Sequence, residues 1–230
     1  MSIRKLFALS MVGLMFGVGC FNQSNPVGED TVIPSIPNIV FNGPISNNIP
    51  ANLQQFIGLF NGNASIGLNY LNLAIFTSPS VDENSFSWEV TWDQVTANIL
   101  AEKNSDGSVD WQVTVNGSDN NVTYTNWVAL KGVAQLDGNT GVWSIYSENS
   151  TTKSAEFTWV VDGNNNKNGT LELFATNQIY ELLNNSDKSG SLVLKENNVK
   201  VYEAQWNTDG TGTWTSWDAQ GNQTDTGNWN

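Results

Sequence analysis

The sequence predicts an all-β protein, an antiparallel meander of roughly eleven or twelve strands. From Phe86 to the C-terminus, short runs of alternating polar and apolar residues are separated by turns rich in Asn, Asp and Gly, the pattern of consecutive antiparallel strands. All six prolines lie between Pro26 and Pro79, so the region that follows loses no backbone donor to proline. An open twisted sheet seldom carries so many strands, and we therefore expect closure into a barrel or folding over into a sandwich.

Residues 1–19 have the character of an export signal. Two bases, Arg4 and Lys5, precede an apolar run over residues 6–18, which is too short for a membrane-spanning helix of about 20 residues. The run leads into Gly17-Val18-Gly19-Cys20. One interpretation is an ordinary secretory signal followed by an incidental cysteine.

The other interpretation is that Gly17-Val18-Gly19-Cys20 resembles the lipobox of bacterial lipoproteins, from which it departs at Gly17, where an aliphatic residue is usual. This resemblance covers only the leader. It implies that signal peptidase II removes residues 1–19 and that Cys20 carries a diacylglycerol anchor. It also implies the outer membrane as the destination, because Phe21 rather than Asp follows the cysteine.

Residues 20–48 are expected to form a tether between the anchor and the domain. Four prolines are spread through this polar and β-branched stretch. Because proline fixes φ and has no backbone donor, the stretch favours an extended chain. As an equal alternative, the apolar residues at 32–36 and 39–41 lie along the surface of the domain.

Residues 49–78 are expected to form a short helical hairpin packed on the sheet. Pro50 can occupy the first turn of a helix. The apolar residues that follow it at helical spacing are Leu53, Phe56, Ile57 and Phe60. After a polar stretch at 61–65, residues 66–76 are apolar almost all round and predict a second, largely buried helix. The alternative is a lid over a cavity.

Residues 80–230 form the predicted meander. Trp88 and Trp92 share one face of the first strand with two other apolar residues, and Asp106-Gly107 between two alternating runs marks a hairpin. The expected strands are residues 86–92, 98–103, 109–115, 122–136, 142–146, 155–161, 170–175, 179–183, 191–195, 199–206, 211–217 and a last run ending at 229.

A four-residue phrase, Thr-Gly-x-Trp, recurs within the meander and ends at Trp143, Trp214 and Trp229. We interpret each copy as a glycine turn followed by a strand that carries an indole.

The composition excludes several classes of function. The chain has no histidine, and Cys20 is its only cysteine, which excludes His-dependent nucleophilic catalysis and zinc sites built from His or Cys. With 22 acidic against nine basic residues, it lacks the clustered Lys and Arg that nucleic-acid binding needs. No metal or cofactor is predicted. The loop at 162–166 has oxygen donors at alternate positions, but it lacks the glycine and the bidentate glutamate of calcium loops.

Two further kinds of site remain compatible with the sequence. A carboxylate pair could hydrolyse a glycosidic bond, with Glu89 and Asp93, or Glu203, in that role; nothing selects one pair, so no catalytic residue is assigned and no enzyme is expected. Aromatic recognition is the other. Trp214 and Trp217 have opposite parity on one strand, so one of them is exposed unless the strand is bulged or covered on both faces.

Trp214 and Trp217 are therefore the first candidates for a ligand platform, with Trp88 and Trp92 as further candidates and core packing as the alternative for all four. The expected function is a lipid-anchored, non-catalytic binding or structural module of the cell envelope. The alternatives are a carbohydrate-binding surface protein, a carrier of an acyl chain or other apolar ligand in a partly closed barrel, which is a fold-level analogy with periplasmic carriers, and a carboxylate-dependent glycosidase.

Overall fold

The computed structural model describes residues 34, 39–46, 48–72, 78–119 and 121–230. Beyond Ser65, only the backbone of the helix that begins at Ala51 is described. The expected signal peptide, the lipidation site at Cys20 and most of the expected tether lie outside the described residues.

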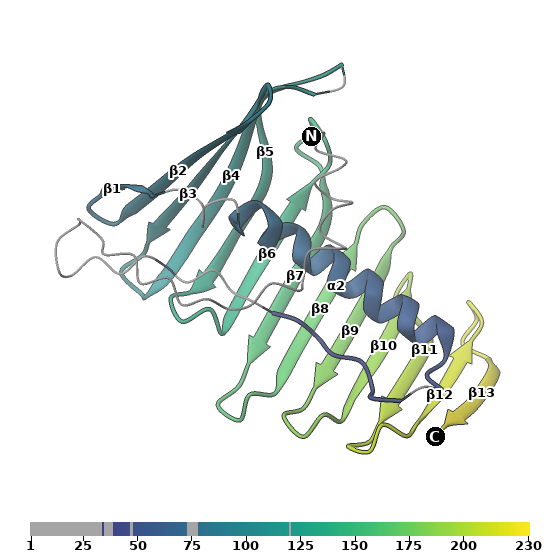
Figure 1. Ribbon diagram of the computed structural model, residues 1–230. Coiled ribbons are helices and arrows are strands. Elements are labelled where there is room, and N and C mark those ends of the chain that lie inside the picture. Colours follow the sequence, from purple (N-terminus) through teal and green to yellow (C-terminus); the bar gives the residue numbers. More distant parts are fainter. Residues whose placement is uncertain (1–33, 35–38, 47, 73–77, 120) are drawn as a thin grey trace.

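The described residues form one antiparallel sheet of thirteen strands in which every strand pairs with its neighbours in sequence, as Figure 1 shows. The predicted meander is confirmed. The strands are β1 (Ser80–Asp82), β2 (Ser85–Trp92), β3 (Val95–Lys103), β4 (Ser108–Asp119), β5 (Val122–Gln135), β6 (Thr140–Tyr146), β7 (Lys153–Val161), β8 (Lys167–Leu173), β9 (Gln178–Asn184), β10 (Gly190–Glu196), β11 (Val199–Trp206), β12 (Gly212–Trp217) and β13 (Gln223–Trp229). The three-residue β1 is the strand that the sequence did not predict.

The sheet is open among the described residues, because the strand order runs from β1 to β13 without a pairing between those two. Closure was expected as the way to cover the apolar face of so many strands. Instead, a helix and an extended segment lie across one face of the sheet (Figure 1). We call this face the inner face and the opposite one the outer face.

Strand β5 bends near the point where its pairing with β6 ends. It spans 14 residues, but only residues 130–134 pair with β6, whereas β4 pairs along its whole length with two register shifts. Such bulges bend a strand and increase its twist. The first half of β5 therefore extends beyond its pairing with β6, while β4 stays paired with β3 as far as Gly117, so that only the tip of the β4–β5 hairpin projects beyond the sheet (Figure 1).

One continuous helix, α2 (Ala51–Asn72), stands where a hairpin of two helices was expected. Side chains within the polar stretch at 61–65 bond back to the helix instead of ending it: Asn63 Nδ2 donates to the carbonyl of Leu59 at 2.8 Å, and Ser65 Oγ to that of Gly62 at 2.9 Å. The helix is held on the sheet both before and within this polar stretch, because Leu53, Phe60 and Ala64 are all buried. Tertiary packing thus overrides weak local helix propensity.

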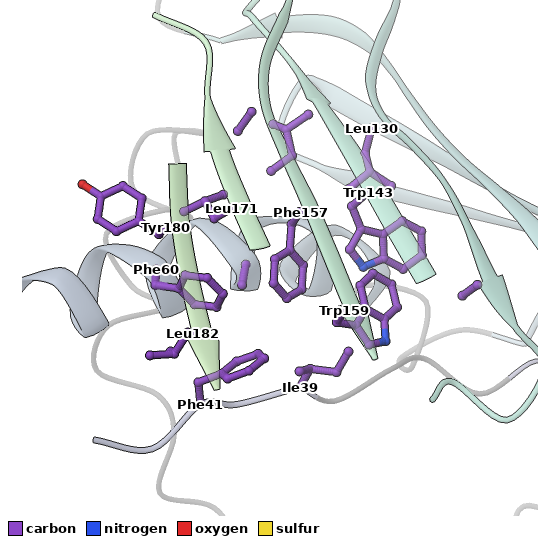
Figure 2. Close-up of a cluster of buried hydrophobic side chains, with 14 of the residues drawn as sticks. Ile39, Phe41, Phe60, Leu130, Trp143, Phe157, Trp159, Leu171, Tyr180 and Leu182 are labelled. Atoms are coloured by element: carbon purple, nitrogen blue, oxygen red, sulfur yellow. The ribbon is translucent and has the colours of Figure 1, made fainter. Parts of the chain in front are cut away.

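Residues 39–46, which we call the strap, belong to the domain. Ile39 and Phe41 are buried, which decides for residues 39–41 between the two interpretations of the tether. The Phe41 ring packs edge-on against Phe60 of α2, with 5.0 Å between centroids, and against Phe157 of β7 at 6.4 Å. Figure 2 shows these rings meeting between the strap, the helix and the sheet.

Two asparagine side chains hold the strap by its backbone. Asn61 of α2 accepts from the Phe41 N–H at 3.1 Å and donates to the Phe41 carbonyl at 2.7 Å. Asn184, at the end of β9, makes the same pair of bonds to Asn42, at 2.5 and 2.7 Å. Because a side-chain amide offers both a donor and an acceptor, each one bonds the backbone N–H and the backbone carbonyl of one strap residue.

The glycines of the Thr-Gly-x-Trp phrase do not form turns, which corrects the interpretation from sequence. Each one lies within a strand, directly opposite a tryptophan of an adjacent strand. The pairs are Gly141 with Trp159, Gly212 with Trp229 and Gly227 with Trp214. A Cβ on any of these glycines would come within 2.7 Å of the indole, so only glycine leaves room for the ring.

Candidate binding surfaces

The inner face is filled by the protein's own side chains. The largest of the fully buried ones include Trp143, Trp159 and Phe157 from the sheet, Phe60 from α2 and Phe41 from the strap, and Figure 2 shows them in one cluster. An acyl carrier needs an apolar cavity of several hundred cubic ångströms. The space that such a cavity would occupy is taken here by aromatic rings.

Trp88 and Trp92 both belong to the inner face. Trp88 is 5% exposed and stacks on Phe86 and Trp111, with centroids 6.4 and 6.1 Å apart. Trp92 is half-buried against the same cluster, and its Nε1 is buried without a hydrogen-bond partner among the described residues. Their position explains both indoles as packing.

Trp214 and Trp217 lie on opposite faces, as their parity requires. Trp214 sits opposite Ala204 on the inner face and stacks on Tyr202, with 6.2 Å between the ring centroids. Trp217 follows Ser216, which pairs with Tyr202, and so points to the outer face. Trp217 is thus the one of the four candidate indoles whose ring stands on the polar side of the sheet.

Trp217 stands beside a charged group on β11. Lys200 Nζ lies 4.3 Å from the centroid of the Trp217 ring, within the range of a cation–π contact, and also bonds Glu203 Oε2 at 2.7 Å. The hydrogen bond from Lys200 lowers the pKa of Glu203, against the opposing effect of burial. We call Trp217, Lys200 and Glu203 the Trp217 platform.

A hollow that the sequence did not reveal lies between the first half of β5, which does not pair with β6, and the turn from β6 to β7. Its volume is about 440 Å³, within the range of about 300–1,000 Å³ typical of ligand sites. We call it the β5 hollow. Its lining residues are Thr125, Asn126, Trp127, Val128, Lys131, Tyr146, Asn149, Ser150 and Thr151.

The walls of the β5 hollow are fixed by hydrogen bonds between β5 and the β6–β7 turn. Trp127 Nε1 donates to the carbonyl of Ser147 at 3.0 Å, and Asn149 Nδ2 donates to that of Thr123 at 2.8 Å. The Tyr124 hydroxyl donates to Glu148 Oε1 at 2.7 Å. The hollow is therefore held open between two elements that are tied together.

A second hollow of about 380 Å³ adjoins the first on the outer face and shares Lys131 with it. We call it the Gln112 hollow. Its lining residues are Leu100, Glu102, Asp110, Trp111, Gln112, Lys131, Gly132, Val133, Val142 and Ser144. Unlike the β5 hollow, it contains carboxylates.

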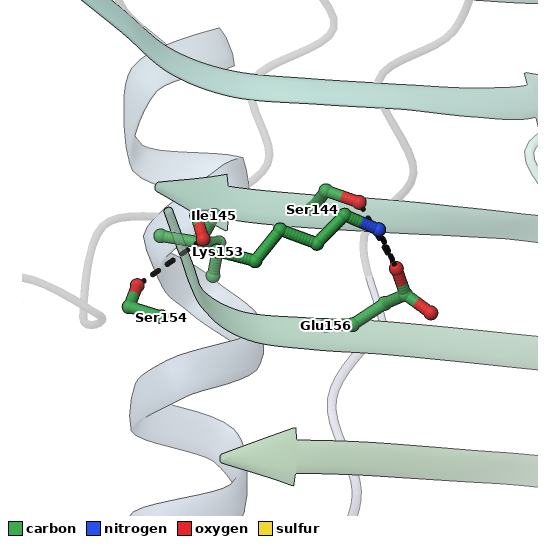
Figure 3. A network of polar contacts seen from close by, with 5 residues as sticks. All are labelled: Ser144, Ile145, Lys153, Ser154 and Glu156. Carbon is green, nitrogen blue, oxygen red and sulfur yellow. Dashed lines mark hydrogen bonds and ion pairs between the residues drawn. The ribbon is translucent and has the colours of Figure 1, made fainter. Parts of the chain in front are cut away.

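A polar network borders this region on β6 and β7. Lys153 Nζ forms an ion pair with Glu156 Oε2 at 2.5 Å, and Ser144 Oγ donates to the same oxygen at 3.1 Å. Figure 3 shows both contacts. The hydrogen bond from Lys153 is the main reason why the pKa of Glu156 is lowered, so this carboxylate stays ionised and committed to its neighbours.

The carboxylates that the sequence offered for acid–base work are not brought together. Glu89 pairs across strands with Asn98, Asp93 occupies the β2–β3 turn with φ of 55°, and Glu203 stands on β11 in an ion pair. A third hollow, of about 570 Å³, lies along residues 82–85 and 102–104. It contains none of these three carboxylates.

The loop at 162–166 uses its carboxylate internally. Asp162 Oδ1 accepts from the backbone N–H groups of Asn164 and Asn166 at 2.9 and 2.8 Å, and Oδ2 accepts from the Asn166 side chain. These bonds lower the pKa of Asp162. The described residues contain no group of three or more His, Cys, Asp or Glu arranged to hold a metal ion.

Comparison with protein-family models and with curated proteins gives no match for this chain. In the part of the chain that the structure describes, no helix is long and apolar enough to cross a membrane.

Proposed function

We propose that this protein is a lipid-anchored, non-catalytic binding module of the cell envelope that engages its ligand through the outer face of the sheet. The observation that carries the proposal is the filled inner face, where the strap and α2 cover the aromatic cluster of the sheet. Binding at that face would require these elements to leave. The outer face, with its hollows and the Trp217 platform, needs no such rearrangement.

Carbohydrate is the ligand class that the outer face supports best. Sugar rings stack on exposed aromatic side chains and direct their hydroxyl groups to carboxylates, amides and hydroxyls nearby. At the Trp217 platform, the indole lies beside Lys200 and Glu203, and Gln205 Nε2 donates to Glu203 Oε1 at 3.0 Å. Glu89, Asp93 and Glu203, the carboxylates that the sequence offered for a glycosidase, line none of the three hollows, whereas that reaction needs two carboxylates about 5–10 Å apart across a cleft.

The anchor is tested by fractionating cells that express variants at the lipobox-like segment. Cys20→Ala removes the acyl acceptor, so we expect the protein to leave the membrane fraction. Phe21→Asp keeps the acceptor, and membrane association should persist. A Cys20→Ala protein that stays in the membrane fraction contradicts the anchor.

The ligand surface is tested on a glycan array with the full chain. Trp217→Ala removes the platform ring and should weaken the binding signal, whereas Trp217→Phe keeps a flat ring and should retain more of it. Because Trp217 is only half-buried, both variants should keep the far-ultraviolet circular dichroism spectrum of the wild type. Unchanged binding by Trp217→Ala would exclude the platform as the ligand surface.

A further inference from the structure

We infer that the β5 hollow is a second binding site, specific for a carboxylate-bearing sugar such as a uronic acid residue, with Lys131 as the counter-ion of the sugar carboxylate. The inference rests on the proposed glycan-binding function and extends it from a platform to a sugar class. It does not depend on Trp217, which lies at the other end of the sheet on β12.

The charge of the lining is the first argument. The chain carries 22 acidic and nine basic residues, yet the β5 hollow is lined by one lysine and no carboxylate. Glu102 and Asp110 line the Gln112 hollow on the other side of Lys131, and Glu148 of the β6–β7 turn is bonded to the Tyr124 hydroxyl. The side chains that line the hollow therefore carry a charge opposite to that of the molecule as a whole.

The state of Lys131 is the second argument. Its cross-strand partners are the neutral Gln112 and Ser144, and in the described part of the chain its Nζ makes no ion pair, hydrogen bond or ring contact. Among the lysines described, only the Nζ of Lys188 likewise lacks all three. The engaged lysines are Lys103 over the Phe86 ring, Lys153 with Glu156, Lys167 with the Val40 carbonyl, Lys195 with Glu181 and Lys200 with Glu203.

The remaining lining supplies what a sugar ring needs. The half-buried Tyr146 offers aromatic surface, and Asn126, Ser150 and Thr151 offer amide and hydroxyl groups at the rim. Amides and hydroxyls can each donate to or accept from sugar hydroxyls. A small inorganic anion would use only Lys131, whereas a sugar acid would use the whole lining.

The hydrogen bonds across the hollow lower the conformational entropy that is lost when a ligand binds. The β6–β7 turn is already tied to β5 through Ser147 and Asn149. A ligand then orders few additional groups when it enters. Charge-assisted hydrogen bonds are about twice as strong as neutral ones, so the carboxylate should dominate the choice between sugars.

The test is isothermal titration of the purified full-length protein with glucuronate, with glucose as the neutral match, and with a polyuronate oligosaccharide as the polymeric source of the same group. We expect glucuronate to bind at least about tenfold more tightly than glucose, and the preference to shrink as salt is raised. If only the oligosaccharide binds, the site takes the acidic residue within a polymer. Equal affinity for glucuronate and glucose overturns the inference.

Variants locate the site. Lys131→Gln should remove the preference for glucuronate, Lys131→Arg should keep it because the charge remains, and Tyr146→Ala should weaken acidic and neutral sugars alike. Lys188→Gln is the matched control, since it removes an equally unpaired lysine from the β9–β10 turn of the described chain. A Lys131→Gln protein with wild-type preference refutes the assignment, and an unchanged circular dichroism spectrum shows that the variant has folded.

The two proposals can fail separately. If Trp217→Ala loses glycan binding while Lys131→Gln does not change the choice of sugar, the outer-face function stands and the second site is refuted. If Lys131→Gln loses the preference while Trp217→Ala binds normally, the β5 hollow is the ligand site and the platform is not.

Discussion

Gly169 is the point at which the strap, the helix and the sheet come closest, and replacing it with alanine tests the packing of the inner face. Gly169 lies in β8, opposite Trp159 and Leu182. A Cβ there would lie 2.5 Å from Cζ of Phe41 and 2.8 Å from Cζ of Phe60, about an ångström inside ordinary carbon contact. Both rings are fully buried and pack edge-on against each other, so neither can turn aside freely.

Two opposing effects set the magnitude. Overpacking a filled core destabilises the folded state by about 1–3 kcal/mol. In the opposite direction, alanine has less conformational freedom than glycine in the unfolded chain, which stabilises the folded state by about 0.5–1 kcal/mol. We therefore expect Gly169→Ala to lower the free energy of unfolding by about 1–2 kcal/mol, which corresponds to a few degrees in melting temperature for a chain of this size. Urea unfolding followed by tryptophan fluorescence measures the change.

Two controls make the measurement specific. A Cβ on Gly163 would meet no atom within 4 Å, and the φ of Gly163 is not positive, so Gly163→Ala should be neutral or slightly stabilising. In a Phe41→Leu background, where the ring that meets the new methyl group is gone, Gly169→Ala should cost clearly less. Wild-type stability of Gly169→Ala, or an equal cost in both backgrounds, would refute the proposed contact between strap and sheet.

Three further predictions concern polar groups. Asn184→Leu should lower the free energy of unfolding by about 2 kcal/mol, since it removes two hydrogen bonds of about 1 kcal/mol each, and should expose the strap to limited chymotrypsin cleavage at Phe41. Resistance to cleavage equal to that of the wild type would contradict the role of Asn184 in holding the strap. Asp209 accepts two hydrogen bonds from Thr211, which lower its pKa, so its contribution to stability is present above about pH 4 and is lost in more acidic solution. Asp209→Asn should flatten that acid dependence in urea midpoints. Burial raises the pKa of Tyr202 to about 12, against about 10 when unfolded, so the wild type should lose stability between these pH values and Tyr202→Phe should lose less.

Most of the sheet could be predicted because each strand carries its own local signal. The alternation at residues 199–206 gives β11 with both of its ends, and three turns share one chemistry, at 104–108, 185–189 and 207–211. In each, an Asn begins the turn, the Asp two residues later accepts from a Ser or Thr backbone N–H, and the Asn amide bonds that Ser or Thr hydroxyl. Such a turn is decided within five residues, so sequence alone suffices.

The features that were missed depend on contacts between distant residues. Nothing near Asn61 or Asn184 in the sequence indicates that each amide binds a strap residue, because the partners of Asn184 are 142 positions away. The β5 hollow depends on the register shifts between β4 and β5, which decide where Trp127 and Lys131 lie relative to Tyr146. Periodicity gives the face of a residue but not the bulge that brings two elements together.

The recurring Thr-Gly-x-Trp phrase shows how a correct pattern can carry an incorrect physical reason. Glycine beside a turn suggests a need for positive φ, but the positive φ belongs to the turn residues Gly138, Lys188 and Gly210. Their carbonyls accept the indole N–H of Trp159, Trp206 and Trp229, at 3.0, 3.1 and 2.7 Å. Gly141, Gly190 and Gly212 follow these turns in their strands and make room for the same rings; Gly190 has this role although it lies outside the phrase. A turn, a glycine and a tryptophan of the next strand thus form one unit, which ties each of these hairpins to the inner face.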